Sequence, residues 1–108
     1  MLTKTDINLK SLTDHFEIAE RREDRKGQIY RSRGAVQAFY AMLVKNNDLD
    51  WQYMEKWSHS YRSVFVSKIA KATATYCEGD WILHISDDQE SFEANIQHAI
   101  QFYEIESN

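Results

Sequence analysis

The chain has 108 residues, of which 43% are hydrophobic and 28% charged, and its formal net charge is −4 at pH 7. This length fits one domain, residues 1–108, and this composition excludes a disordered chain. The single Cys77 excludes an internal disulfide, and no apolar run reaches the ~20 residues of a membrane span. Because the first residues also lack the apolar stretch of a signal peptide, we expect a cytoplasmic protein that does not bind membranes.

The scarcity of chain-breaking residues favours long helices. Proline is absent and only three glycines occur. We therefore predict an α+β fold that is mostly helical, with four or five helices and one β-hairpin at about 73–85 before a C-terminal helix.

The first predicted helix covers residues 8–26, where apolar residues follow the 3-4-3 spacing of one buried helix face. These residues are Leu9, Leu12, Phe16 and Ala19. Asn8 or Ser11 is the expected cap. Gly27 is the expected end, because glycine adopts the left-handed conformation of a helix C-terminus without steric cost.

Two further helices are predicted in the middle of the chain. One runs from residue 32 or 34 to residue 45 and carries a wide apolar stripe. The next starts at residue 48 or 50 and carries bulky side chains three and four positions apart. They are Trp51, Met54, Trp57 and Tyr61.

The following segment contains the strongest strand signal. Residues 61–72 are predicted as helix, although Val64-Phe65-Val66 is a run of strand formers. Residues 73–77 and 80–85 are rich in β-formers, and they flank the two-residue turn Glu78-Gly79. This pattern is typical of a β-hairpin.

The last helix follows the hairpin. Ser86 with Gln89 is the predicted capping box, and Asp87 and Asp88 lie at the positive end of the helix dipole. Its apolar face has 4-3-4 spacing and consists of Phe92, Ile96, Ala99 and Tyr103.

Charge is distributed unevenly along the chain. Residues 1–72 contain all 13 basic and 9 of the acidic side chains, whereas residues 73–108 contain 8 acidic and no basic ones. The acidic part either packs on the basic part of its own domain or of a second copy, or it is a docking surface for a basic partner. The basic part is alternatively a phosphate-binding segment within residues 21–33. Its candidate contacts are Arg21, Arg22, Arg25, Lys26, Arg31 and Arg33.

No catalytic, cofactor-binding or metal-binding residue is predicted. The histidines (His15, His59, His84 and His98) show no metal-ligand spacing, and the glycines are too far apart for a phosphate loop. Cys77 has acidic neighbours, which disfavour a reactive thiolate.

The main hypothesis is therefore a small non-enzymatic binding or regulatory protein of the inhibitor, immunity or adaptor type. We expect it to bind a protein partner, or a second copy of itself, through an aromatic or acidic surface. The predicted contact residues are Trp51, Trp57, Tyr61, Arg62, Glu90 and Glu93. A nucleic-acid-associated protein acting through residues 21–33 is the first alternative. A small enzyme that uses His59 or His84 with a nearby carboxylate is the second.

Overall fold

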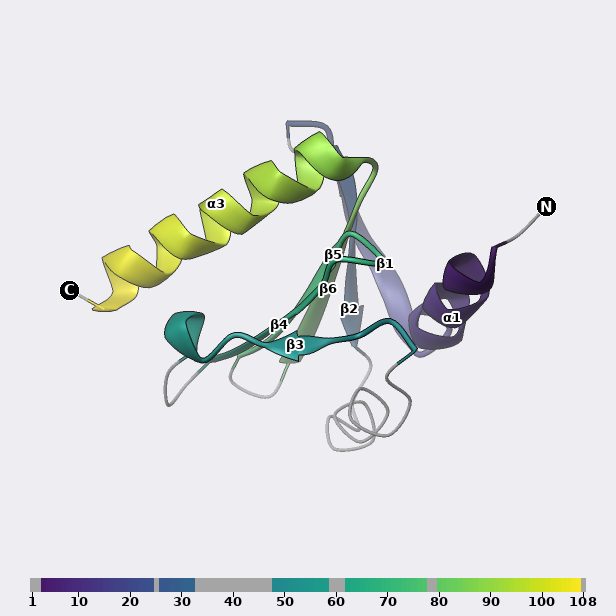
Figure 1. Ribbon diagram of the computed structural model, residues 1–108, viewed down its shortest axis with the longest axis horizontal. Helices are drawn as coiled ribbons and strands as arrows, with labels where there is room; N and C mark the ends of the chain where they lie inside the picture. Colours follow the sequence, from purple (N-terminus) through teal and green to yellow (C-terminus); the bar gives the residue numbers. More distant parts are fainter. Residues whose placement is uncertain (1–2, 25, 33–47, 59–61, 78–79, 108) are drawn as a thin grey trace.

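The computed structural model describes residues 3–24, 26–32, 48–58, 62–77 and 80–107, with the backbone alone for Trp57, Cys77 and residues 99–107. In chain order the elements are the helix α1 (Lys4–Thr13), the strands β1 (Phe16–Arg22), β2 (Gly27–Ser32) and β3 (Gln52–Tyr53), the short 3-10 helix η1 (Glu55–Trp57), the strands β4 (Arg62–Ser67), β5 (Ala72–Cys77) and β6 (Asp80–Ser86), and the helix α3 (Gln89–Ser107). The strands form one sheet in the order β1-β2-β6-β5-β4-β3, and every neighbouring pair is antiparallel. The helices α1 and α3 lie on opposite sides of it (Figure 1).

The prediction of a mostly helical fold with four or five helices is wrong. The described residues contain two α-helices and a six-stranded antiparallel sheet, so the fold is mainly β. Low proline and glycine content removes helix breakers, but it equally permits strands joined by short turns of other residues.

The helix predicted over residues 8–26 is replaced by α1, β1 and a turn. The helix α1 begins at Lys4, because the Thr3 hydroxyl accepts from the Asp6 N–H and the Asp6 carboxylate accepts from the Thr3 N–H, both at 3.0 Å. Phe16 is buried from strand β1, and a bulge in β1 lies around Ala19. The apolar spacing that imitates one helix face therefore spans two different elements.

The helix predicted to start at residue 48 or 50 and the helix predicted over residues 61–72 are also wrong. Asp50 has a φ of 50°, a left-handed conformation that no continuous helix contains. The residues directly after it, 51–58, contain only the short strand β3 and the 3-10 helix η1. Residues 62–67 form β4, whose side chains are nearly all buried, so the strand shows no alternation of polar and apolar residues. The helix predicted up to residue 45 lies outside the described residues.

The predicted hairpin and final helix are confirmed. The strands β5 and β6 pair from Ala72 opposite Ile85 to Cys77 opposite Asp80, and α3 follows. The cap is different from the predicted one: Asp88 Oδ1 accepts from the Ser91 N–H at 2.8 Å, while Ser86 is the last residue of β6.

The sheet has two unlike faces. The face toward α1, here called the aromatic face, carries Phe65, Tyr76, Trp81 and Leu83 and contains most of the hydrophobic core. The face toward α3, here called the α3 face, carries the alternate residues of the same strands. Among them are Val64, Val66, His84 and Ser86. This second face is where the candidate site lies.

Candidate binding groove

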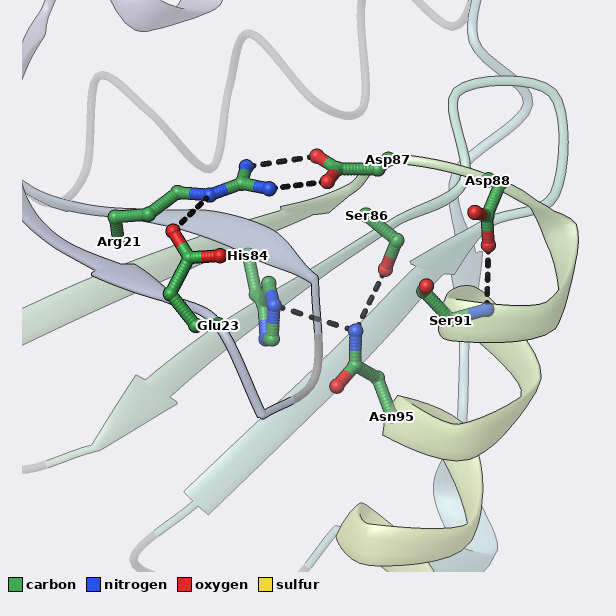
Figure 2. A network of polar contacts seen from close by, with 8 residues as sticks. All are labelled: Arg21, Glu23, His84, Ser86, Asp87, Asp88, Ser91 and Asn95. Atoms are coloured by element: carbon green, nitrogen blue, oxygen red, sulfur yellow. Dashed lines mark hydrogen bonds and ion pairs between the residues drawn. The ribbon is translucent and has the colours of Figure 1, made fainter.

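Buried hydrogen bonds attach α3 to the sheet. Asn95 is 4% exposed; its Nδ2 donates to Ser86 Oγ at 2.6 Å and is hydrogen-bonded to His84 Nε2 at 3.2 Å (Figure 2). Both a side-chain amide and an imidazole can donate or accept a hydrogen bond, so this contact joins α3 to β6 in either tautomer of His84. The Asn95 Oδ1 atom is buried and has no hydrogen-bond partner within the described part of the chain.

Gly27 makes this arrangement of His84 possible. A Cβ atom at Gly27 would lie 2.3 Å from Nε2 of His84 and 2.9 Å from the carbonyl oxygen of Ile85. Glycine is thus required here by lack of space, and its predicted role as the end of a helix is wrong. Gly27 is instead the first residue of β2 and pairs with Arg22 and Ser86.

Charged groups fix the start of α3. Arg21 on β1 binds the Asp87 carboxylate through both Nη atoms, with Nη1 2.7 Å from Oδ1, and it also contacts Glu23 (Figure 2). The guanidinium lowers the pKa of Asp87, and the hydrogen bond from the Ser91 amide lowers the pKa of Asp88. Both carboxylates are therefore most favourable to the fold when ionised.

A groove of about 770 Å³ lies between α3 and the edge of the sheet formed by β3 and β4. Ten side chains from these elements and the residues beside them line it. They are Asp50, Gln52, Met54, Val66, Lys68, Gln89, Phe92, Glu93, Ile96 and Gln97. We call it the α3 groove. This volume is within the range of about 300–1,000 Å³ that is usual for ligand sites.

The α3 groove has a charged end and an apolar end. Gln52 pairs with Val66, so Asp50 and Lys68, each two residues further out, lie at the same end of the two strands. The strands β4 and β6 both pair antiparallel with β5 and therefore run in the same direction, which places the start of α3 at this end too. Further along α3, Ile96 lies toward the end marked by Met54, where the lining is apolar.

The structure separates the predicted partner-binding residues. Trp51 is part of the hydrophobic core and Arg62 is buried in β4, so neither presents its side chain at the surface. Trp57 belongs to η1, with its side chain undescribed, and Tyr61 lies outside the described residues. Glu93 lines the α3 groove, and the exposed Glu90 lies one turn before it on the same helix.

The predicted phosphate contacts are partly occupied by acidic neighbours. Arg21 binds Asp87 and Glu23, and Arg22 binds Asp24 and lies 3.6 Å from Glu20. Among these ion pairs, Arg21–Asp87 alone joins the basic segment to the acidic part of the chain. Lys26 is exposed in the turn before β2, and Arg31 is exposed on β2. Arg25 and Arg33 lie outside the described residues.

The catalytic alternative names two histidines, of which the structure describes only His84. His84 is buried against Gly27 and contacts Asn95, and His59 lies outside the described residues. Among the described residues, no three histidine, cysteine, aspartate or glutamate side chains lie close enough together to hold a metal ion.

Sequence reasoning missed most of the groove. Phe92 and Ile96 were recognised as one face of the last helix, but Met54 and Val66 were assigned to helices that do not exist. Asn95 gave one usable signal: a polar amide between the apolar positions Phe92 and Ile96 needs a buried polar partner.

No family model, curated protein or solved structure matches the chain. None of the helices in the described ranges is long and apolar enough to cross a membrane.

Proposed function

We propose that the protein is a small non-enzymatic binding protein that holds a segment of a protein partner in the α3 groove. The observation that carries this proposal is the groove itself, in which the half-buried Met54 and Ile96 provide apolar surface beside polar side chains, over the buried Val66 and Phe92. Removing such surface from water favours binding, and the polar groups around it give orientation.

The chemistry of the lining supports binding in preference to catalysis. The ten lining residues include no histidine, cysteine, serine or threonine. Its carboxylates accept hydrogen bonds from neighbouring glutamines: Asp50 from Gln52 at 2.9 Å, and Glu93 from Gln89 at 3.3 Å. A hydroxyl or thiol nucleophile paired with a histidine base is therefore absent from these ten described side chains.

Selection of peptides from a random displayed library tests the proposal. Ile96→Trp fills the apolar end of the groove, and Gln97→Trp does the same from the rim if the first variant folds poorly. We expect selected peptides to bind the wild type and to lose at least about tenfold in affinity, about 1.4 kcal/mol, on the filled variant.

Ile18→Trp is the matched control, because Ile18 is 71% exposed on β1 at the opposite edge of the sheet. Peptide affinity should be unchanged by it. Failure to select any peptide, or equal binding to the folded groove-filled variant, would overturn the proposal.

A further inference from the structure

The helical wall of the α3 groove carries only negative charge. From residue 73 onward the chain has no lysine or arginine, so no such side chain on α3 neutralises Glu93, which lines the groove, or the exposed Glu90 one turn before it. Glu90 makes no ion pair or hydrogen bond with any described residue, and Glu93 accepts only from the Gln89 amide. Both carboxylates keep most of their capacity to bind a cation.

The opposite wall carries one charge of each sign. Lys68 has no ion pair or hydrogen bond among the described residues, and Asp50 accepts only from Gln52. Lys68 lies at the charged end, near the start of α3, whereas Glu93 lies one turn beyond Gln89. The potential in the groove is therefore negative along α3 and is opposed at one end by a single lysine.

The length of the groove limits what it can hold. Eight residues separate Gln89 from Gln97, which is about 12 Å along a helix at ~1.5 Å per residue. This length corresponds to about four extended residues at ~3.3 Å each, or to about two helical turns.

We infer that the occupant of the α3 groove is a short basic and apolar segment of a protein partner. Its lysine or arginine binds Glu93, and its apolar side chains cover Met54 and Ile96, which are half-buried in the groove. This inference rests on the proposed function and adds the chemistry of the partner. It also assigns opposite effects to two residues: Glu93 attracts the segment, and Lys68 repels it.

Two displayed libraries test the inference. Both contain the same apolar residues, but one has lysine and arginine as its only charged residues and the other aspartate and glutamate. We expect the basic library to give at least about tenfold more wild-type binders. For a selected basic peptide, Glu93→Lys should weaken binding about two- to fivefold and Lys68→Glu should strengthen it by a similar factor, as is usual for exposed ion pairs.

Glu20→Lys on β1 is the matched control, since it changes the same charge at the far edge of the sheet and should leave affinity unchanged. Selection of acidic peptides, or equal affinity for wild type and Glu93→Lys, would overturn the inference. If Ile96→Trp still abolishes binding in that case, the α3 groove remains the site and only the partner chemistry is wrong. If Ile96→Trp has no effect, the proposed function fails as well.

Discussion

The two faces of the sheet are built from the same strands but held by different forces. On the aromatic face, the ring centroids of Phe65 and Trp81 are 5.7 Å apart and those of Tyr76 and Trp81 are 5.4 Å apart, within a continuous hydrophobic core. On the α3 face, two hydrogen bonds from Asn95 join the helix to β6. The aromatic face is closed by apolar packing, whereas the α3 face combines the buried Val64, Val66 and Phe92 with a few polar contacts.

This difference explains why the groove lies where it does. Apolar packing leaves few voids, because every gap forfeits contact energy. Hydrogen bonds between fixed pairs of atoms hold a helix at one place and leave the space beside it open. The aromatic face therefore contributes most of the stability, and the α3 face offers the binding surface.

The largest expected effect is on the aromatic face. Trp81 is 1% exposed, and Trp81→Ala should lower the free energy of unfolding by about 3–5 kcal/mol, measured by urea denaturation. Tyr53→Ala is the control on the same face, because Tyr53 is 53% exposed and contacts Phe65 at the sheet edge. A loss for Trp81→Ala as small as that for Tyr53→Ala would contradict the comparison.

Gly27→Ala should have the next largest effect, about 1–3 kcal/mol of lost unfolding free energy, because the new methyl group overlaps the His84 ring. In a His84→Ala background the cost should shrink, since the ring is gone. It should not vanish, because the Ile85 carbonyl oxygen stays 2.9 Å from the methyl position. Equal costs in both backgrounds would show that the His84 ring is not what excludes a side chain.

Asn95→Ala should cost about 1–2 kcal/mol, since it removes two hydrogen bonds from Asn95 and leaves Ser86 and His84 with fewer partners. Hydrogen exchange should accelerate in α3 much more than in β4 and β5. Gln97→Ala, at the rim of the groove, is the control. Uniform acceleration throughout the sheet would mean that both faces unfold as one unit.

The smallest effect concerns acid stability. Asp87 and Asp88 have lowered pKa values in the folded protein, so their contribution is complete above about pH 4, the unfolded range of aspartate, and is lost as pH falls through the lowered values. Asp87→Asn with Asp88→Asn should therefore flatten the decline of stability below pH 4, measured by thermal melts across pH. Asparagine keeps the cap at residue 88. An unchanged pH dependence would show that these two carboxylates do not cause the loss of stability below pH 4.

Local sequence patterns predicted correctly those elements for which several independent signals indicate the same structure. The hairpin of β5 and β6 combines β-formers with the intervening sequence Glu78-Gly79, and α3 combines acidic residues at its start with a clear helical period. The strands β1 and β4 lack such agreement. The bulge in β1 breaks its alternation, and β4 is buried on both faces and shows none.

The candidate site was less accessible to sequence reasoning than the fold. The α3 groove joins residues near positions 50, 66 and 93, and this proximity follows only from the strand order of the sheet. Glu90 and Glu93 could be singled out because charge is visible without a fold. Whether Trp51 and Arg62 are buried depends on the pairing of distant strands, which no local pattern encodes.

The position of β6 in the sheet has a consequence for synthesis. It is the last strand in the chain, yet it lies between β2 and β5 and joins the β1–β2 pair to the β3–β4–β5 group. During translation these two groups emerge first, each with an unpaired strand edge of the kind that promotes aggregation. Trp81 and Leu83 lie on β6 and belong to the hydrophobic core, so the core between the two groups of strands is incomplete until β6 has been synthesised. A nascent chain that ends before residue 80 is therefore two incomplete half-sheets, and the final insertion of one strand converts them into a protein.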